Sequence, residues 1–199
     1  LDGLFWNVRS ERVPLYLTNG TAQNALADAM QEIPGARNGR IIDLGCGFGQ
    51  TTFTLARRFP DAEVVGVETA PLVFALAWLR LLPLRGKGVA TVAYRSLWKE
   101  DLSRYDIVYC FLSPAPMGKL YGKAKAEMKP GALLVSNSFK VPDVEPERII
   151  ELGDGRQLRQ VDDGDDAAAR RDTERCRSAS PLASAGPSAA HAPSNAWKA

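Results

Sequence analysis

Three glycines at alternate positions, Gly45, Gly47 and Gly49, directly follow a short apolar run. Glycine allows backbone conformations that are closed to other residues, and it lets a ligand approach main-chain N–H groups closely. An amphipathic helical pattern starts at Gln50, so the unpaired donors and positive dipole end of a helix N-terminus lie next to the loop. These residues predict a polar cradle for a small ligand.

An acidic residue, Glu68, ends the next apolar run, about twenty residues beyond the glycines. A carboxylate at that place can accept hydrogen bonds from both hydroxyls of an adenosine ribose. Because nicotinamide cofactors share that requirement, Glu68 alone does not separate the two classes of ligand. A dinucleotide-binding turn has the pattern GxGxxG, whose third glycine would stand where this chain has Gln50. The loop therefore argues against a nicotinamide cofactor.

Apolar, β-branched runs alternate with helical patterns along the middle of the chain, which is typical of βαβ units and of a parallel sheet. The fold class predicted is α/β, with a doubly wound, mostly parallel sheet. We expect strands at Arg40–Leu44, Glu63–Val67, Val89–Ala93, Asp106–Phe111 and Ala132–Ser136. We expect helices at Thr21–Glu32, Gln50–Phe59, Pro71–Leu82 and Met117–Met128.

The segment DLGCGFG, which begins at Asp43, is followed by VVGVE, which ends at Glu68. Together the two segments resemble the first two motifs of class I, Rossmann-like S-adenosylmethionine-dependent methyltransferases. The resemblance implies that Asp43 and the Gly45–Gly49 loop, including Cys46, surround the methionine part of S-adenosylmethionine, and that Glu68 holds its ribose. A scaffold whose glycines only form a tight turn is the structural alternative.

From about Val13 to Leu152, the chain is similar to small bacterial methyltransferases and to membrane-associated protein-lysine methyltransferases of mitochondria. The segment Val13–Thr18 looks like the one that precedes the first helix in that group, which implies that Thr18 sits over the cofactor. After the third strand, Ser96 stands where related enzymes often have an acid. The resemblance implies that Ser96 and Leu97 contact the adenine.

The segment Tyr105–Pro114 resembles the fourth-strand motif of the family, whose far end faces both the sulfonium and the substrate. Ligands on such sheets bind beyond the carboxyl ends of the strands, so Phe111 is expected beside the cofactor, and Leu112, Ser113 and Pro114 on the substrate side. The segment lacks the Asp/Asn-Pro-Pro-aromatic motif of amino-group methyltransferases, which argues against a DNA-adenine or release-factor-glutamine substrate. For Ser113 and Pro114, a simple strand-ending turn is an equal alternative.

The predicted function is transfer of a methyl group from S-adenosylmethionine to a protein lysine amine or to a small molecule. The cofactor brings the electrophile, and the protein brings alignment and a water-poor pocket, so no catalytic residue is assigned. Two alternatives stay open. An NAD-linked oxidoreductase is disfavoured by Gln50 and by a lone histidine, His191, which lies in a low-complexity stretch. A non-catalytic scaffold without a cofactor is the other.

Composition restricts the partners. The formal net charge of +2 does not indicate a nucleic-acid binder, and no nucleic-acid partner is expected. The three cysteines, Cys46, Cys110 and Cys176, lie far apart, so neither a metal site nor a disulfide framework is expected. The chain reads as cytoplasmic, because it has no apolar run of about eighteen residues. The aromatic and basic stretch Leu1–Leu17 can also flank a membrane anchor, so membrane association through a segment upstream of Leu1 is the alternative.

Three parts are expected along the chain: an N-terminal extension at 1–20, the methyltransferase domain at 21–160, and a low-complexity, disordered tail at 161–199. One more strand is predicted at Arg148–Leu152. The segment that follows offers only Leu158 and Val161 to a core. We therefore expect the hairpin that closes the sheet to be incomplete.

Overall fold

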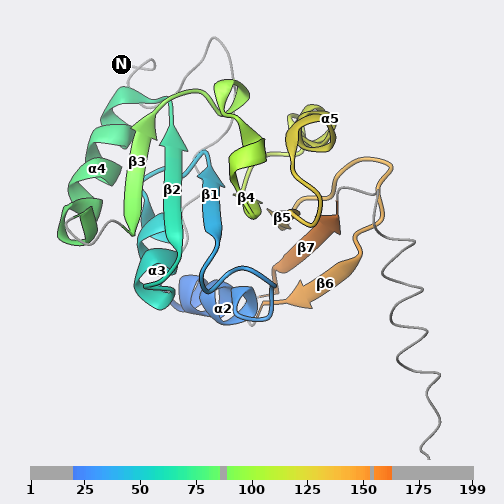
Figure 1. Ribbon diagram of the computed structural model, residues 1–199, viewed down its shortest axis with the longest axis horizontal. Helices are drawn as coiled ribbons and strands as arrows, with labels where there is room; N and C mark the ends of the chain where they lie inside the picture. Colours follow the sequence, from blue (N-terminus) through green and yellow to red (C-terminus); the bar gives the residue numbers. More distant parts are fainter. Residues whose placement is uncertain (1–19, 86–88, 153–154, 163–199) are drawn as a thin grey trace, which may run out of the picture. The chain divides into compact units, whose positions relative to one another are not determined.

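The computed structural model describes residues 20–85, 89–152 and 155–162. The strands of this part are β1 (Arg40–Leu44), β2 (Glu63–Glu68), β3 (Ala90–Tyr94), β4 (Ile107–Cys110), β5 (Leu133–Asn137), β6 (Arg148–Glu151) and β7 (Gln157–Asp162). They form a seven-stranded sheet in the order β3-β2-β1-β4-β5-β7-β6 (Figure 1). β1 to β5 are parallel, and β7 runs antiparallel to β5 and β6.

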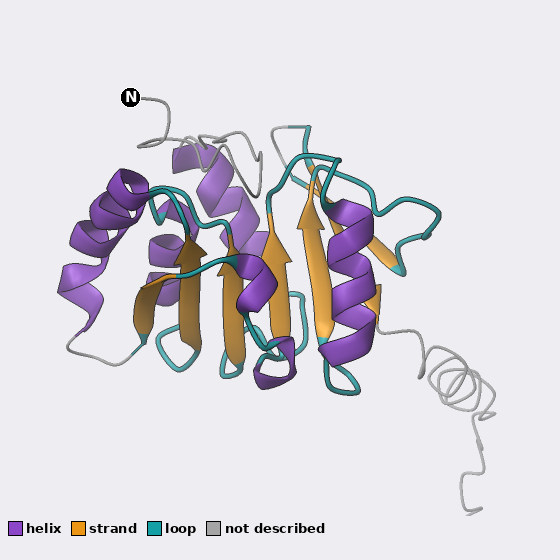
Figure 2. Ribbon diagram, turned by 90° about the horizontal axis from the view of Figure 1, so that it is seen from above, coloured by secondary structure: helices purple, strands orange, loops and turns teal. Residues whose placement is uncertain are grey.

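Helices cover both faces of the sheet (Figure 2). One face packs against α2 (Gly20–Met30), α3 (Gln50–Arg58) and α4 (Pro71–Arg85), and the other against α5 (Met117–Glu127) and the 3-10 turns η1 (Leu97–Lys99) and η2 (Leu102–Arg104). Neighbouring strand residues alternate between the two cores: Ile41 lies in the core with α2 and α3, whereas Ile42 lies in the core with α5. The inner parallel strands are buried on both faces, which is why they are mostly apolar, whereas the edge strand β3 leaves Thr91 and Tyr94 exposed.

The strand order reverses beside β1, and ligands bind at such a point in open α/β sheets. β1 pairs with β2 on one side and with β4 on the other, and the register sets Asp43 opposite both Gly66 and Tyr109. The carboxyl ends of three strands therefore meet at one edge. The glycine loop, Glu68 and Phe111 all follow or end these strands.

The predicted α/β class and mostly parallel sheet are confirmed. The predicted elements agree with the observed ones within one or two residues, except at the end of α4. This helix was expected to stop at Leu82 before a proline, but Pro83 lies inside it and the helix continues to Arg85. Because proline has no N–H, the helix lacks the hydrogen bond that position 83 would otherwise donate to the Leu79 carbonyl oxygen, and it ends two residues later. Among the described residues, no helix has both the length and the apolar character needed to cross a membrane.

The expectation of an incomplete closing hairpin was wrong. β6 and β7 form an antiparallel hairpin, and β7 pairs with β5 from Leu133 to Asn137. Two buried side chains of β7, Leu158 and Val161, are enough because its backbone is hydrogen-bonded on both sides. Polar side chains are accommodated as well: Arg159 donates to the Ser138 carbonyl oxygen at 2.5 Å. The small number of apolar residues therefore did not predict that β7 completes the sheet.

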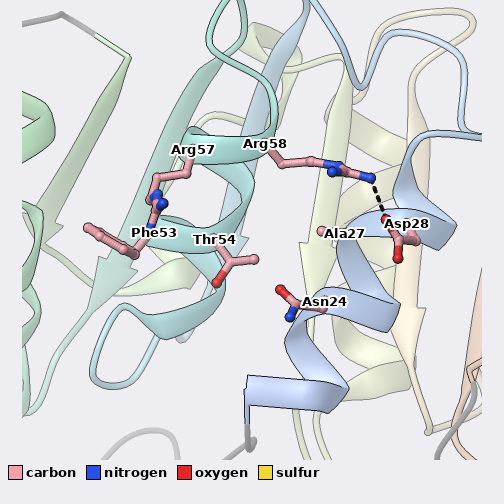
Figure 3. A pocket seen from close by; sticks show the side chains of 7 residues that line it. All are labelled: Asn24, Ala27, Asp28, Phe53, Thr54, Arg57 and Arg58. Atoms are coloured by element: carbon pink, nitrogen blue, oxygen red, sulfur yellow. Dashed lines mark hydrogen bonds and ion pairs between the residues drawn. The ribbon is translucent and has the colours of Figure 1, made fainter.

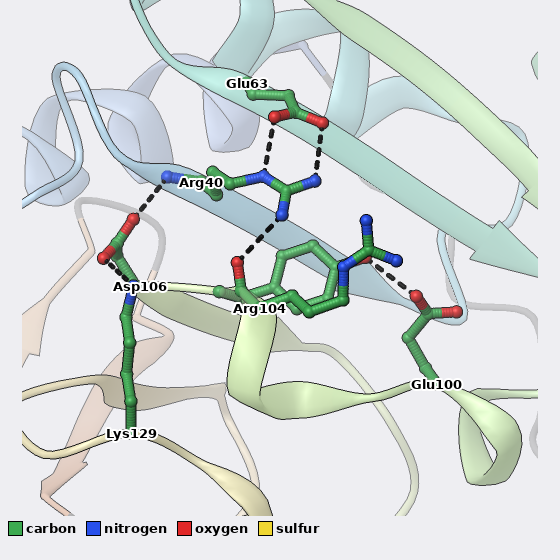
Figure 4. Close-up of polar contacts among 7 residues, drawn as sticks. Arg40, Glu63, Glu100, Arg104, Asp106 and Lys129 are labelled. Carbon is green, nitrogen blue, oxygen red and sulfur yellow. Dashed lines mark hydrogen bonds and ion pairs between the residues drawn. The ribbon is translucent and has the colours of Figure 1, made fainter.

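Charged residues join the amino ends of the central strands (Figure 4). The Arg40 guanidinium donates to both carboxylate oxygens of Glu63 at 2.6 and 2.8 Å, and to the Arg104 carbonyl oxygen at 3.2 Å. The Arg40 backbone N–H donates to Asp106 at 2.7 Å, and Lys129 forms an ion pair with the same carboxylate at 2.6 Å. This cluster, called the amino-end clamp below, ties β1 and β2 to the segments before β4 and β5.

Candidate functional site

The glycine loop has the backbone that its sequence predicts. Gly45, Gly47 and Gly49 have φ angles of 70°, 55° and 70°, a region that disfavours residues with a Cβ. The Cys46 N–H donates to the Val67 carbonyl oxygen at 3.0 Å, and the Gly49 N–H donates to the Cys46 carbonyl oxygen at 2.9 Å. The loop is therefore a compact turn fixed to the end of β2.

Two of these glycines are also required by close packing. A methyl group on Gly45 would lie 3.0 Å from Leu112 Cδ2, and one on Gly49 would lie 3.1 Å from Ala77 Cβ. The loop is thus held between the segment after β4 and helix α4. Leu112, predicted on the substrate side, is 1% exposed and packs against the loop at Gly45.

Glu68 joins the loop to the end of β2. Its carboxylate accepts the Gly47 N–H at 3.1 Å and, through the other oxygen, the N–H groups of Thr69 at 2.7 Å and Ala70 at 2.9 Å. The glycine loop and the acidic residue therefore meet, as a shared ligand would require. Thr69 and Ala70 were not predicted, because nothing in their side chains indicates a main-chain role.

Asp43 lies beneath the loop and is 3% exposed. Thr52 Oγ1 donates to Asp43 Oδ2 at 2.7 Å. Burial raises the pKa of Asp43 to about 7, and the nearby negative charge of Glu68 adds to the rise, whereas the Thr52 hydrogen bond opposes it. Thr52 was missed by the sequence analysis. The only feature of the sequence that could have indicated a role for Thr52 is its position in the first turn of the helix after the loop.

Cys46 packs tightly against β2. A Cβ on Gly66 would stand 2.8 Å from the Cys46 sulfur and 2.9 Å from Thr52 Oγ1, so the glycine at that position makes room for both. Burial, followed by the charges of Asp43 and Glu68, raises the pKa of the Cys46 thiol well above its ordinary value. A neutral, buried thiol is a packing group and a poor nucleophile.

The predicted adenine contacts lie next to Glu68. Tyr94 of β3 pairs with Glu68, and the following Arg95 N–H donates to the Glu68 carbonyl oxygen at 3.1 Å. Ser96 caps the turn η1, because its Oγ accepts the Trp98 N–H at 3.3 Å. The Leu97 side chain is 2% exposed and belongs to the core, so this residue offers main-chain groups rather than an open apolar surface.

The segment after β4 runs from the core to the surface. Ser113 is buried and Pro114 is exposed, and the Pro114 carbonyl oxygen accepts the Met117 N–H at 3.2 Å, which starts α5. Pro114 therefore forms the turn that was its structural alternative, at the same edge of the sheet as the loop. Phe111 stacks on Phe139 with ring centroids 6.1 Å apart.

Two residues beside Phe111 were not predicted. Phe139 follows the end of β5, and the guanidinium carbon of Arg156 lies 5.5 Å from the centroid of the Phe111 ring. The topology could have indicated Phe139, because β5 is the neighbour of β4 in a sheet of this class. Nothing in the sequence indicated Arg156, because it lies in the turn of the hairpin that was expected to be incomplete.

Thr18 lies outside the described residues. Within the described part, no group of three or more His, Cys, Asp or Glu residues is placed to hold a metal ion. A cavity of about 550 Å³ opens between α2 and α3 (Figure 3). In it Arg58 pairs with Asp28 at 2.5 Å, and Arg57 lies over the Phe53 ring at 5.6 Å. None of its residues was predicted as functional.

Comparisons with known proteins place the chain in a family. Residues 43–148 match the family model described as the ANTKMT methyltransferase domain. The chain is 30% identical over 121 residues to a protein-lysine N-methyltransferase of Saccharolobus islandicus, covering 61% of this chain and 75% of that protein. It is 31% identical over 150 residues to an adenine nucleotide translocase lysine N-methyltransferase of Mus musculus, and the match covers 73% of this chain and 64% of that protein.

A solved structure shares the fold. An RNA methyltransferase of Salinibacter ruber, in complex with S-adenosyl-L-homocysteine, has a TM-score of 0.66 at 22% identity and covers 75% of this chain and 95% of its own. The chain spans 28% to 75% of the length of four curated relatives that it matches. Fold and site define a class I, Rossmann-like methyltransferase domain. The chain belongs to the ANTKMT methyltransferase domain family.

Proposed function

We propose that this domain binds S-adenosylmethionine and transfers its methyl group to a lysine amine of a protein. The observation that carries the proposal is the meeting of Glu68 with the Gly47 N–H across the ends of β1 and β2. A ribose-binding carboxylate and a loop of three left-handed glycines are thereby placed at one edge, beside the reversal in strand order.

The residues present fit this cofactor. Two carboxyl groups, Asp43 and Glu68, lie at the loop, and the segment Asp43–Gln50 contains no basic residue. Such surroundings favour a cationic sulfonium over the phosphates of a dinucleotide. Gly45–Gly49 and Asp43 would hold the methionine part, Glu68 the ribose, and Ser96 and Leu97 the adenine. When bound, S-adenosylmethionine supplies an electrophilic methyl group.

The acceptor is proposed from two supports. Two relatives are named protein-lysine methyltransferases. In addition, the stacked rings of Phe111 and Phe139 stand at the end of β4, where an apolar wall can exclude water from an amine. A lysine amine has an ordinary pKa of about 10.4 and must lose its proton before it reacts. Burial beside a positive charge favours the neutral amine, so the protein needs no dedicated base.

The test of cofactor binding compares two carboxamide variants in the same strand. Glu68→Gln changes the carboxylate at the carboxyl end of β2, and Glu63→Gln changes one at its amino end, which is paired with Arg40. We expect calorimetric affinity for S-adenosylmethionine to fall by about tenfold or more in Glu68→Gln, because hydrogen bonds to a charged acceptor are lost. Affinity should be unchanged in Glu63→Gln. Binding of NAD in place of S-adenosylmethionine would overturn the proposal.

The acceptor requires a second experiment. The protein is incubated with methyl-labelled S-adenosylmethionine and a cell lysate, and labelled protein is digested and analysed for methyl-lysine. Label in lysine of a protein band supports the proposal. Label that appears only in small molecules leaves the methyltransferase assignment intact but removes the lysine acceptor.

A further inference from the structure

The cavity between α2 and α3 is separate from the site proposed for S-adenosylmethionine. Thr52 of α3 donates to Asp43 beneath the glycine loop. Phe53, Thr54 and Arg57 of the same helix line the cavity instead. The volume of about 550 Å³ is in the range of small-molecule sites. A ligand bound in this cavity would therefore be a second ligand of the domain.

The lining of the cavity carries more positive than negative charge. Two of the lining residues, Arg57 and Arg58, are cations, and one, Asp28, is an acid. Asp28 pairs with Arg58 across the two helices at 2.5 Å, which offsets one of the cations. Arg57 forms no ion pair with a residue in the described ranges 20–85, 89–152 and 155–162. The cavity is thus electrostatically suited to an anion.

Both guanidinium groups are held in place without a ligand. The guanidinium carbon of Arg57 lies 5.6 Å from the centroid of the Phe53 ring, which is a cation–π contact. Figure 3 shows Arg57 turned toward Phe53, whereas Arg58 reaches across to Asp28 of α2. Side chains that are already ordered lose less entropy when a ligand binds. The planar fork of N–H donors on each guanidinium matches the oxygens of a phosphate group.

We propose that this cavity binds a small polyphosphate anion. Because Arg57 and Arg58 extend in different directions, a ligand that meets both must carry more than one anionic group. A phosphate group with about two negative charges also competes well with the single carboxylate of Asp28 for Arg58. The exposed amide of Asn24, on the α2 side of the cavity, adds further N–H donors.

A polyphosphate at this place would join two helices near the cofactor loop. α3 begins at Gln50, directly after the glycine loop, and the Thr54 hydroxyl already donates to Gln23 of α2 at 2.7 Å. The bound anion would add a second connection between α2 and α3, at Arg57 and Arg58. The inference concerns a second ligand, so it does not depend on the methyl acceptor.

The test is titration calorimetry of the full chain with inorganic triphosphate, without divalent metal ions. This probe has neither ribose nor adenine, so it lacks the groups that Glu68 would recognise. We expect one triphosphate to bind per chain. Arg57→Gln and Arg58→Gln should each weaken binding by about tenfold, because charge-assisted hydrogen bonds are lost. Arg80→Gln removes the same charge from an exposed position on α4, and should change the affinity by less than about twofold.

Two further variants distinguish a shaped site from general attraction by charge. Asn24→Trp places a large ring in the cavity without changing the charge, and should weaken binding by about tenfold. Asp28→Asn removes the acid that competes for Arg58, and should strengthen binding by about threefold. All the substituted side chains are exposed, so thermal melting without triphosphate should show that the variants are folded.

Three results would contradict the proposal. The first is the absence of saturable binding to the parent protein up to about 1 mM triphosphate. The second is an equal loss of affinity in Arg57→Gln and Arg80→Gln, which would mean that the anion responds only to overall charge. The third is a loss of triphosphate binding in Glu68→Gln, which would place the anion at the cofactor loop. Failure of S-adenosylmethionine to bind would overturn the proposed function and leave this site unaffected.

Discussion

At the scale of single residues, the site is organised around two carboxyl groups with different surroundings. Glu68 accepts three main-chain N–H groups, whereas Asp43 is buried with one hydroxyl donor. Burial raises the pKa of Asp43 to about 7. Without a ligand, Asp43 therefore titrates in the physiological range.

The first prediction concerns proton release on binding. A cationic ligand at the loop stabilises the charged form of Asp43, so the affinity for S-adenosylmethionine should rise with pH up to about 7, and binding should release a proton. Calorimetry in two buffers with different ionisation enthalpies measures the proton. In Asp43→Asn the release should disappear. A proton count that is the same in this variant would contradict the assignment.

The second prediction compares two glycines. Gly49→Ala places a side chain in a left-handed conformation and 3.1 Å from Ala77, so we expect a loss of about 1 to 3 kcal/mol of unfolding free energy. Gly122→Ala adds a methyl group in a helix where no atom lies within 4 Å, and should stabilise by about 0.5 to 1 kcal/mol. Urea denaturation measures both. Equal effects would mean that packing at Gly49 is not restrictive.

At the scale of elements, the order and type of most strands and helices follow from local patterns. The buried parallel strands are short, apolar and β-branched, and each is separated from the next by a helical repeat or a turn. The glycine loop and Glu68 were predictable because the loop joins a strand to a helix and Glu68 ends the next strand of the same βαβ unit. Thr52 lies in that unit too, but a hydroxyl in the first turn of a helix does not by itself indicate Asp43 as its partner. Arg156 was not predictable, because its contact with Phe111 depends on how the closing hairpin packs on the sheet.

The closing hairpin shows the limit of composition as a guide. β7 reads as polar, yet its Gln160 is 9% exposed and its backbone is paired on both sides. A pattern of side chains does not show that two ladders of main-chain hydrogen bonds are available. Only the sheet as a whole supplies them.

The third prediction tests the contribution of this hairpin. Leu158→Ala removes a side chain that is 1% exposed in β7, and should reduce the free energy of unfolding by about 2 to 5 kcal/mol. Ile149→Ala in β6, where the side chain is 48% exposed, should change it by less than about 1 kcal/mol. Similar, small effects of the two changes would indicate that the hairpin adds little to the core.

At the scale of the whole molecule, the carboxyl groups at the two ends of the parallel strands have pKa values shifted in opposite directions. Arg40 lowers the pKa of Glu63 through hydrogen bonds and its positive charge. Burial would raise the pKa of Asp106, but the Arg40 N–H and the Lys129 ammonium outweigh it, so that pKa is lowered as well. At the other end, the pKa of Asp43 is raised.

The fourth prediction follows from these opposite shifts. The stabilisation from Glu63 and Asp106 is present at neutral pH and is lost as the pH falls through their lowered pKa values. That from Asp43 is present in acid and is lost as the pH rises to about 7. The unliganded protein should thus be most stable at weakly acidic pH. In Asp43→Asn, the free energy of unfolding, measured by denaturation at several pH values, should still fall in acid but should no longer fall as the pH rises to about 7. A profile that is the same as that of the parent protein would contradict this prediction.

The amino-end clamp lies at one end of the strands, and the segments that would face an acceptor, around Ser113 and Phe139, lie at the other. Mutations that reshape the acceptor side leave the clamp's ion pairs untouched. Under the function proposed above, side chains on the acceptor side can therefore change without loss of the ion pairs that hold the amino ends of the strands together.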